Sequence, residues 1–235
     1  MPAASLVIIP TYNERENIEP MAAAVLRALP DADLLVVDDA SPDGTGELAD
    51  RLARGSDRIA VLHRPRKEGL GPAYREGFTW ALARPYERII EMDCDFSHDP
   101  ADLPRLVAES RRGADLVIGS RYIPGARIVG WPPHRHLLSA AANGYARLLL
   151  GRAVRDWTSG FKCFRRSALE PVIEGGALAN GYVFQIQGTY RVLRRGLRVV
   201  EVPIIFRERT RGTSKVRYNS AIEAFLKVVE LRWRG

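Results

Sequence analysis

The sequence predicts an α/β fold in which a doubly wound, mostly parallel sheet carries flanking helices on both faces. Short apolar runs alternate with segments of helical spacing through the first half of the chain, and this order is typical of parallel sheets. The 235 residues, 46% of them hydrophobic and 27% charged, suit a soluble α/β unit with a filled core. We therefore expect a single domain that spans residues 1–235.

Five strands are expected in the first half, each a short run of apolar residues, at 6–9, 34–37, 59–62, 88–92 and 116–118. Helices are expected between them, where apolar residues recur every three or four positions, at 17–29, 45–52, 71–83 and 103–110. Thr45 can cap the second of these helices. Strand and helix thus alternate without a break up to the fifth strand.

The second half of the sequence is less regular. Residues 122–133 contain two glycines and three prolines, which predicts a long loop. Helices are expected at 134–150, where large apolar residues recur, and at 182–193. Residues 199–206 resemble an edge or bulged strand, because Pro203 cannot donate to a sheet. A polar basic loop at 207–218 and an amphipathic helix at 221–233 complete the chain.

Two carboxylates stand at the predicted end of the fourth strand, in Asp93-Cys94-Asp95. Side chains two apart in an extended segment point to the same side, and open α/β sheets bind ligands at the carboxyl ends of their strands. Two close carboxylates repel unless a proton or a cation lies between them. A hard divalent cation, held together with substrate phosphates, fits this pair. An acidic strand-to-loop turn is the alternative, since Asp is common there.

Positive charge is concentrated at the C-terminal end. Residues 191–235 hold 12 Lys and Arg against 4 Asp and Glu, so this segment is +8 and the rest of the chain −1. Such a segment suits nucleic acid, an anionic membrane surface or a phosphate-bearing substrate. We expect no signal peptide and no spanning helix, because a strand begins almost at once and no apolar run approaches the ~18 residues required. Two cysteines give no disulfide framework and no zinc pattern.

Candidate chemical groups follow four of the predicted strands and should line one crevice. They are Pro10-Thr11-Tyr12-Asn13-Glu14, Asp38-Asp39, Asp93-Cys94-Asp95 and Gly119-Ser120-Arg121. A flat aromatic ring, several carboxylates and an arginine suit a nucleotide diphosphate bound through a metal. A dinucleotide redox site and a P-loop are unsupported, because neither glycine-rich motif occurs.

Six motifs in order resemble those of inverting GT-A glycosyltransferases, and most closely those of dolichol-phosphate (polyprenyl-phosphate) mannose synthases. They are P-T-Y-N-E, V-D-D-x-S-x-D-G-T, D-x-D, G-S-R-Y, D-W-T-S-G-F-K at 156–162 and R-T-R-G-T-S-K at 209–215. The resemblance implies a GT-A fold with a nucleotide-sugar-binding half at 1–120 and an acceptor-binding half at 121–235. It implies metal-dependent transfer of mannose from GDP-mannose to a polyprenyl (dolichyl-type) phosphate with inversion, and Mg²⁺ or Mn²⁺ as the cofactor.

The resemblance also assigns site residues. The donor nucleoside is assigned to Pro10, Tyr12, Glu14, Val37 and Asp39, and the diphosphate and metal to Asp93, Cys94 and Asp95. Asp95 is expected to be the main metal ligand, and Ser97 stands where some members have a glutamine as a further ligand, so water is an alternative there. Positions near the donor phosphates are matched by Arg121, Arg209 and Lys215, and those near the acceptor phosphate by Arg121, Arg135, Ser139 and Arg209. The residues assigned to catalysis are Asp95, Arg121, Arg209 and Lys215.

The chemistry of such an acceptor is simple. A phosphate monoester is already anionic, so its attack needs no catalytic base, only cations that bring two anions together. Such an enzyme is expected on the cytoplasmic side, peripherally bound to the membrane surface or to a membrane-anchoring partner. For that interface the sequence offers Trp233 and the leucines of the helix at 134–150, although burial in the core is the commoner role of such residues.

One alternative within the glycosyltransferase class and two from other classes are also open. One is transfer of glucose or another sugar from a UDP-sugar to a polyprenyl phosphate or a glycan. Another is a nucleotidyltransferase, although its glycine-rich basic loop is missing after the first strand. A third is a nucleic-acid-binding module that uses the basic C-terminal segment, which would leave the carboxylates unexplained; we expect no nucleic-acid partner.

Three further polar residues have candidate roles. Asp156 could orient Arg121 or a substrate hydroxyl, or it could cap a turn. His98 could support the acidic segment or lie exposed in a loop. Asp43 is expected in a turn, within Ser-Pro-Asp-Gly.

Overall fold

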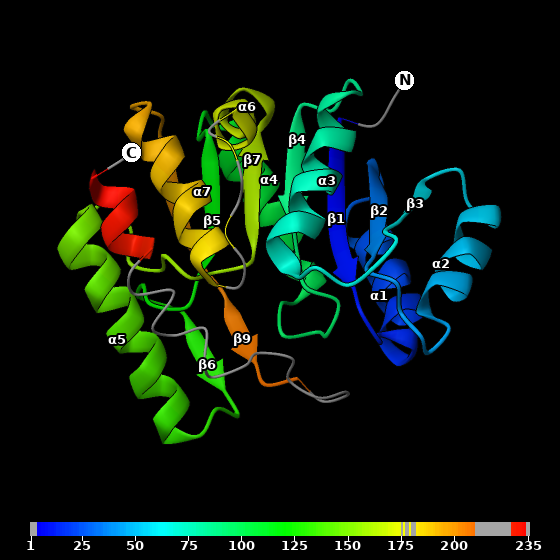
Figure 1. Cartoon of the computed structure of the whole chain (residues 1–235), viewed down its shortest axis with the longest axis horizontal. Helices are drawn as coiled ribbons and strands as arrows, with labels where there is room; N and C mark the ends of the chain where they lie inside the picture. Colours follow the sequence, from blue (N-terminus) through cyan, green and yellow to red (C-terminus); the bar gives the residue numbers. More distant parts are fainter. Residues whose placement is uncertain (1–3, 175, 177–178, 180–181, 210–226, 234–235) are drawn as a thin grey trace.

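The computed structural model describes residues 4–174, 176, 179, 182–209 and 227–233. Its main sheet has seven strands in the order β3-β2-β1-β4-β7-β5-β8 (Figure 1). They are β1 (Ser5–Thr11), β2 (Ala32–Asp38), β3 (Ile59–His63), β4 (Arg88–Glu91), β5 (Leu116–Ser120), β7 (Lys162–Arg165) and β8 (Val199–Pro203). All pair in parallel except β7, which runs antiparallel between β4 and β5. The predicted α/β class and the mostly parallel sheet are confirmed.

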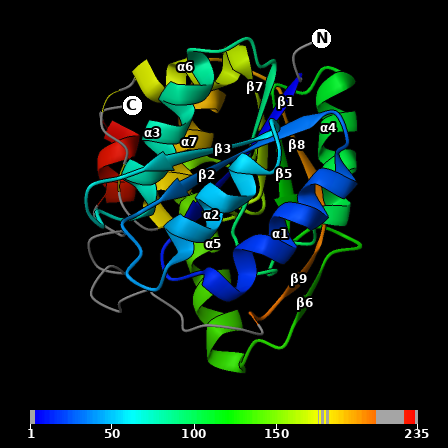
Figure 2. The same ribbon diagram turned by 90° about the vertical axis from the view of Figure 1, so that its right-hand side faces the viewer.

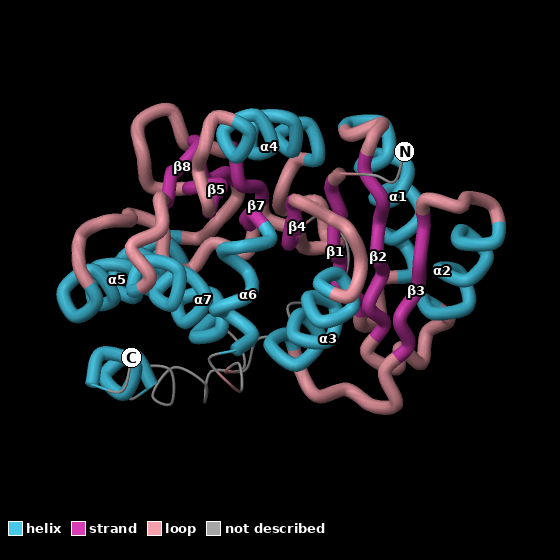
Figure 3. The backbone as a smooth tube through the Cα atoms, turned by 90° about the horizontal axis from the view of Figure 1, so that it is seen from above, coloured by secondary structure: helices cyan, strands magenta, loops and turns pink. Residues whose placement is uncertain are grey.

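Helices cover both faces of the sheet (Figure 3). One layer holds α1 (Arg15–Ala28), α2 (Thr45–Arg54) and α4 (Leu103–Arg111), and the other holds α3 (Leu70–Leu82), α5 (Pro133–Leu150), α6 (Arg166–Glu174) and α7 (Tyr182–Arg194). Alternate residues of β1 separate the two cores, with Leu6 and Ile8 in one and Val7 and Ile9 in the other. This is the period of two that a strand buried on both faces requires.

The first half matches the predicted elements closely, with small shifts at their ends. Gly44, in the left-handed region at φ 87°, is the N-cap residue of α2, so the prediction that Thr45 caps this helix was wrong. The Thr45 hydroxyl instead accepts a hydrogen bond from the Glu14 backbone N–H at 2.9 Å and so ties the loop after β1 to α2. Asp43 lies in a turn, as expected, and accepts from the Thr45 backbone N–H at 3.0 Å.

The second half contains elements that the sequence did not predict. The expected loop at 122–133 includes β6 (Arg127–Val129), and the expected strand at 199–206 divides into β8 and β9 (Ile205–Arg207). Ile204 marks the division, because its N–H donates to Ser120 of β5 while its carbonyl accepts from Arg127. The chain thereby leaves the main sheet, and β9 pairs in parallel with β6 in a second, two-stranded sheet. Of the last predicted helix, residues 227–233 are helical and 221–226 lie outside the described residues.

The direction of β7 shapes the edge of the sheet where the parallel strands end. Lys162, the first residue of β7, pairs with Glu91, the last residue of β4, and with Ile118 of β5. The segment at 156–160 therefore enters the sheet at the edge where the loops after β1, β2, β4 and β5 leave it. The β6–β9 sheet and the first half of α5 extend past this edge, as Figures 1 and 2 show.

Candidate functional site

A cleft of about 420 Å³ lies at this edge. Most of the residues predicted for the site line it, namely Pro10, Tyr12, Glu14, Asp39, Asp93, Cys94, Asp95, Ser97, Arg121, Arg135 and Arg209. Val37 does not, because its side chain is fully buried in the core beside Leu35 and Tyr74. Ser139 lies on α5 and bonds to the hydroxyl of Tyr122 at 2.7 Å, rather than lining the cleft. Lys215 lies outside the described residues.

The backbone around the cleft is strained at three points. Asn13, Ala40 and Phe96 have φ values of 55°, 57° and 58°, and they are the non-glycine residues with positive φ in the described part of the chain. They lie in the loops after β1, β2 and β4 respectively. Such conformations cost about 1 kcal/mol or more each and gather at functional sites. The strain therefore points to the same edge of the sheet as the side chains do.

Asp95 and Asp93 occupy the centre of the cleft in different electrostatic settings. The backbone N–H of Ser97 donates to Asp95 at 3.0 Å, and Arg209 pairs with Asp95 at 2.6 Å. Burial alone would raise the pKa of Asp95, but the bonds from Ser97 and the charge of Arg209 lower it below its ordinary value. Burial, followed by the charges of Asp95 and Glu91, raises the pKa of Asp93 well above its ordinary range. The two carboxyl groups thus resist joint ionisation, and a cation between them would stabilise the doubly charged form.

The oxygen atoms of this pair fit a hard divalent cation. The described residues contain no cluster of three His, Cys, Asp or Glu side chains that would enclose a metal ion. Asp93 and Asp95 would thus supply two carboxylates at the mouth of an open cleft, the arrangement in which Mg²⁺ takes its other ligands from phosphates and water. The backbone N–H of Ser97 donates to Asp95. A role for Ser97 as a third metal ligand stays a prediction.

His98 is not an exposed loop residue, so that reading was wrong. It is 2% exposed, its ring stacks on Phe161 at 5.1 Å, and its Nδ1 lies 3.7 Å from the Asp93 carboxylate. Burial lowers the pKa of His98 well below its ordinary value, so the ring is neutral at pH 7. The Nδ1 atom is buried without a hydrogen-bond partner, and it faces the carboxylate pair from the side of β9, where Phe206 meets the ring edge-on at 5.3 Å.

Arg121 is held by a fully buried carboxylate. Its Nε and Nη2 donate to the two oxygens of Asp156 at 2.8 and 2.7 Å, and its backbone N–H donates at 2.9 Å. Thr158 accepts a further bond from Nη2 at 2.7 Å. The expectation that Asp156 orients Arg121 is thus confirmed. Burial would raise the pKa of Asp156, but the adjacent guanidinium keeps it below its ordinary value.

Local packing explains the sequence around this pair. A side chain at Gly119 would place its Cβ 2.7 Å from the ring of Phe161, so only glycine fits between β5 and the segment before β7. Asn143 of α5 binds that segment from outside, by accepting from the Trp157 backbone N–H at 2.7 Å and donating to Thr158 at 3.1 Å. One glycine and one buried amide therefore fix the position from which Asp156 reaches Arg121.

A second cation lines the wall of the cleft next to α5. Arg135, near the start of α5, pairs with Glu208, and its guanidinium lies 5.2 Å from the ring of Trp131. The guanidinium of Arg121 lies 5.6 Å from the centre of the same ring, so both cations contact one indole. Cation–π contact offsets part of the cost of bringing two positive charges together. Neither Trp131 nor Glu208 was predicted, because both fall in segments read as loops.

The wall formed by the loops after β1 and β2 contains an aromatic face and a buried ionic cluster. The ammonium of Lys67 lies 3.7 Å from the centre of the Tyr12 ring. Asp39 pairs with the buried guanidinium of Arg64 and accepts from the Gly69 backbone N–H at 3.2 Å. These bonds pin the segment between β3 and α3 against the loop after β2. Lys67 and Arg64 were missed because the sequence places no recognisable motif around them.

A buried trio of bonded side chains, the ion pair of Glu91 and Lys162 together with the amide of Gln185, lies at the floor of the cleft. Lys162 donates to the side-chain oxygen of Gln185 at 2.5 Å and lies 3.7 Å from Glu91, while the Gln185 amide nitrogen donates to Glu91 at 3.3 Å. Burial raises the pKa of Glu91 and lowers that of Lys162. Gln185 lines the cleft, whereas Glu91 and Lys162 lie beneath it. Lys162 ends the motif at 156–162, but no motif marks Glu91 or Gln185 as its partners.

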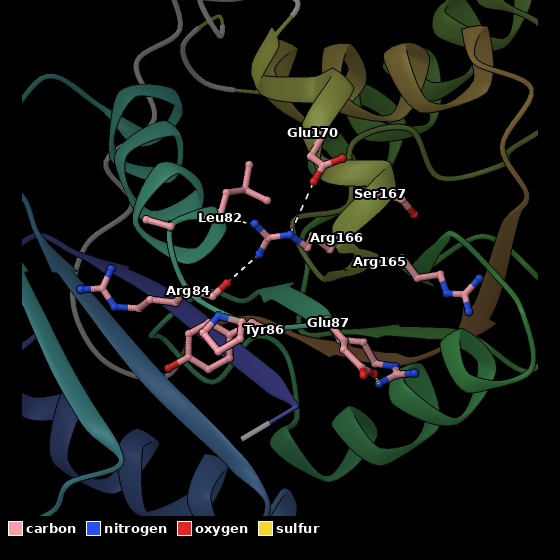
Figure 4. A pocket seen from close by; sticks show the side chains of 11 residues that line it. Leu82, Arg84, Tyr86, Glu87, Arg165, Arg166, Ser167 and Glu170 are labelled. Atoms are coloured by element: carbon pink, nitrogen blue, oxygen red, sulfur yellow. Dashed lines mark hydrogen bonds and ion pairs between the residues drawn. The ribbon is translucent and has the colours of Figure 1, made fainter. Parts of the chain in front are cut away.

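A larger hollow, of about 720 Å³, lies at the opposite edge of the sheet (Figure 4). Its arginines are bonded within the protein: Arg166 donates to the carbonyls of Leu82 and Arg84, and Arg88 pairs with Glu87. Arg166 also approaches Glu170 at 3.5 Å. These contacts tie α3 and α6 to the sheet edge. The polar groups around this hollow are thus bonded to one another rather than directed at a common point where a ligand could bind.

The outer face of α5 is apolar and exposed. Leu137 and Leu148 are 73% and 79% exposed, and Ala141 and Gly144 continue the same stripe at helical spacing. Burial in the core, the alternative role considered for the leucines of this helix, does not hold for Leu137, Leu138 and Leu148, since the buried residues of the helix are Asn143 and Ala146. None of the helices in the described part of the chain has the length and apolar content needed to cross a bilayer.

Sequence comparison with known proteins identifies a family and two relatives that match nearly the whole chain. A family model described as Glycosyl transferase family 2 matches residues 6–173. The chain is 50% identical to the polyprenol monophosphomannose synthase of Mycolicibacterium smegmatis, over 98% of this chain and 88% of the relative. It is 47% identical to the undecaprenyl-phosphate mannosyltransferase of Micrococcus luteus, over 98% of this chain and 96% of the relative.

Solved structures share the fold at low sequence identity. Glucosyl-3-phosphoglycerate synthase from Mycobacterium tuberculosis, in complex with Mn²⁺, uridine diphosphate and glucosyl-3-phosphoglycerate, matches with a TM-score of 0.68 and 21% identity, over 97% of this chain and 77% of that chain. A mannosyltransferase from Pyrobaculum calidifontis, in complex with GDP-Man and Mn²⁺, matches with a TM-score of 0.60 and 16% identity, over 98% of this chain and 63% of that chain. At these identities the likeness concerns the arrangement of the elements.

Proposed function

The chain belongs to glycosyl transferase family 2 and has the GT-A fold, and we propose that it transfers mannose from GDP-mannose to a polyprenyl (dolichyl-type) phosphate. Family membership makes the chain a glycosyltransferase, which leaves the nucleotidyltransferase and nucleic-acid-binding alternatives without support. The relatives named for polyprenyl-phosphate mannosyl transfer support the acceptor and the sugar. The single observation that carries the proposal is the convergence of Asp93, Asp95, Arg121, Arg135 and Arg209 on one cleft.

The donor would lie along the loops that follow β1, β2 and β4. The ring of Tyr12 offers a flat surface for the base, and Glu14 and Asp39 offer carboxylates to the nucleoside. Arg209 pairs with Asp95, and a donor phosphate would be a second acceptor for the same guanidinium. Arg121, fixed by Asp156, would stabilise the charge that builds on the leaving diphosphate. Lys215, which lies outside the described residues, stays a prediction for the same role.

We propose that Asp93 and Asp95 hold Mg²⁺ or Mn²⁺ together with the donor diphosphate. When bound, such a cation supplies Lewis-acid stabilisation of the leaving group. The carboxylate pair supports this assignment through its geometry and through the raised pKa of Asp93. Cys94 would contribute through its backbone, because its side chain is buried in the core cluster beneath the cleft.

The acceptor phosphate would enter between Arg121 and Arg135. Glu208 now balances the charge of Arg135, so an incoming phosphate would exchange partners with that carboxylate rather than meet an uncompensated cation. Ser139 is four residues further along α5, on the same face of the helix. Its hydroxyl accepts a hydrogen bond from Tyr122, and its role at the acceptor phosphate stays a prediction. An anionic acceptor guided by two guanidinium groups can attack without a general base.

The donor and acceptor are tested by a substrate screen with the full chain. GDP-mannose, UDP-glucose and UDP-GlcNAc are each supplied with a short polyprenyl phosphate and Mg²⁺ or Mn²⁺, and the glycolipid is quantified by mass spectrometry. We expect GDP-mannose to give the highest kcat/KM. A higher value with UDP-glucose would favour the glucosyltransferase alternative, and absence of any glycolipid product would contradict the proposal.

The anomeric configuration of the product is a further prediction. Direct attack by the acceptor phosphate inverts the anomeric centre, so an α-linked donor should give a β-linked lipid product. The coupling constants of the anomeric carbon in the purified product, measured by nuclear magnetic resonance, distinguish the two anomers. An α-linked product, or a glycosyl-enzyme trapped and detected by mass spectrometry, would contradict single-step transfer.

We also propose that the exposed face of α5 contacts the cytoplasmic membrane surface, directly or together with a membrane-anchoring partner. The stripe from Leu137 to Leu148 lies on the helix that carries Arg135, and Trp233 is 83% exposed. Arg147 and the exposed Arg152 and Arg232 add positive charge. An apolar stripe beside cations is the pattern of an interfacial helix, and each cation near an anionic leaflet adds about 1 kcal/mol.

Sedimentation with anionic vesicles tests this contact. We expect salt-sensitive binding of the full chain, and a large loss of binding in the double variant Leu137→Glu/Leu148→Glu. The matched control Ala23→Glu/Ala101→Glu makes the same charge change at exposed residues on the opposite helical layer and should bind more strongly than the leucine variant. Equal binding by the two variants, or no binding by the parent chain at low salt, would contradict the proposal.

A further inference from the structure

We propose that the Gln185 side chain hydrogen-bonds to the hexose of the donor. The subsite is bounded by Gly160 and Asp93, and Glu91 and Lys162 hold Gln185 in place from beneath it. This inference rests on the proposed sugar-nucleotide reaction and deepens it, because it names the side chain that senses the sugar's hydroxyl groups. Gln185 lies on α7, far in sequence from every motif of the donor site, and yet it lines the same cleft.

The subsite is a gap between an amide and a carboxylate. A Cβ placed on Gly160 would lie 3.5 Å from the Gln185 amide nitrogen and 3.6 Å from a carboxylate oxygen of Asp93. The absence of a side chain at Gly160 therefore leaves a space with a hydrogen-bond donor on one side and an acceptor on the other. A hydroxyl group both donates and accepts, so adjacent sugar hydroxyls match this pair of groups.

The buried trio fixes which end of the amide faces the gap. Lys162 can only donate, and it donates to the Gln185 side-chain oxygen at 2.5 Å. The amide nitrogen must therefore point the other way, towards Glu91 and Gly160. Glu91 accepts one N–H at a long 3.3 Å, and a primary amide carries two. A sugar hydroxyl at the gap would accept from Gln185 without any rotation of its side chain.

The cost of burying this trio argues for a role beyond stability. Glu91 and Lys162 are both fully buried, and a buried ion pair is often no more stabilising than apolar residues of similar size. The core beside it already contains Phe78, Phe164 and Phe184, so apolar packing was available. A fixed orientation of Gln185 is what the pair provides and apolar residues would not. Glu91 and Lys162 are thus positioning residues, and Gln185 is the group that would touch the substrate.

The first test combines Gln185→Leu with deoxy donors. The kcat/KM of the parent chain is measured with GDP-mannose and with its 2-, 3-, 4- and 6-deoxy analogues. We expect at least one deoxy analogue to lose on the order of 5- to 10-fold in the parent chain, the size of one neutral hydrogen bond. Gln185→Leu should lose the same factor with GDP-mannose and no further factor with that analogue, while its affinity for GDP, measured by calorimetry, stays unchanged.

The second test uses Gly160→Ala, which has room for its methyl group at ordinary contact distances. The added methyl fills the gap, so the KM for GDP-mannose should rise on the order of tenfold while GDP affinity and the thermal midpoint stay unchanged. A matched loss of GDP affinity would show that the gap serves the nucleotide and would overturn the subsite. This test does not depend on Gln185→Leu folding well.

The third test separates positioning from stability. In Glu91→Leu/Lys162→Met both buried charges are replaced by apolar residues of similar length, and we expect a free energy of unfolding near that of the parent chain. The discrimination between GDP-mannose and the sensitive deoxy analogue should nevertheless be lost. If that discrimination is the same in the parent chain, in Gln185→Leu and in the double variant, the subsite is wrong although mannosyl transfer stands. If the parent chain transfers no mannose at all, the proposed function itself fails.

Discussion

Asp95→Asn should lower the rate of transfer by on the order of 10³-fold or more, without unfolding the protein. The change removes one negative charge from the centre of the cleft, where Asp95 both faces the proposed cation site and pairs with Arg209 at 2.6 Å. Loss of electrostatic stabilisation at a leaving group costs several kcal/mol in the transition state. The amide is nearly the same size as the carboxylate and lies in a loop after β4, so the core is untouched.

Two measurements and one control decide this prediction. Turnover of GDP-mannose is measured with and without EDTA, and Mn²⁺ binding in the presence of GDP is followed by electron paramagnetic resonance. Asp102→Asn is the matched control, because Asp102 is a nearby carboxylate whose partner Arg105 is largely exposed and whose loss should cost less than about 1 kcal/mol. Near-normal turnover of Asp95→Asn in excess EDTA would exclude a metal-dependent mechanism that works through this residue.

The first half of the chain follows from local sequence patterns. Short runs of three to five residues predicted β1 to β5, and the helical periodicity between them predicted α1 to α4. The polar residues that end those strands meet at one edge because parallel strands share a direction. Tyr12, Asp39, Asp95 and Arg121 were therefore placed together before any three-dimensional information was used, and all four line the cleft.

The second half of the chain could not be predicted in the same way, because its elements depend on tertiary partners. β7 has four residues and begins with Lys162, so neither its length nor its pattern indicates a strand. It is stable as a strand because β4 and β5 bond to it from both sides. β6 and β9, of three residues each, likewise exist only as each other's partner. Local propensity is weak evidence for such elements.

The contacts that complete the site also depend on tertiary structure. Glu208 reaches Arg135 across 73 positions, and Gln185 reaches Glu91 across 94. No periodicity or motif connects such residues, since each pairing joins segments that meet only in the folded structure. One long-range contact was among the candidate roles read from the sequence, in which Asp156 could orient Arg121 or a substrate hydroxyl, or cap a turn. The structure joins them through three hydrogen bonds.

Removal of that buried carboxylate should produce the largest loss of stability. In Asp156→Ala the guanidinium of Arg121, 6% exposed, loses its buried counter-charge and two of its hydrogen-bond acceptors. Breaking a buried ion pair from one side costs about 3–5 kcal/mol, a large share of the 5–15 kcal/mol that typically holds a domain together. Turnover should fall by about 100-fold as well, because a misplaced cation no longer meets the leaving diphosphate.

Urea unfolding and kcat measurements on three variants separate these two effects. Glu170→Ala breaks the half-exposed pair with Arg166 and should lose less than about 1 kcal/mol. Arg121→Met/Asp156→Leu removes both buried charges, so it should recover much of the stability lost in Asp156→Ala and yet remain inactive. Full activity in the double variant would show that Arg121 has no part in transfer. An unfolding curve of Asp156→Ala that matches the parent chain would show that the buried pair contributes nothing to the fold.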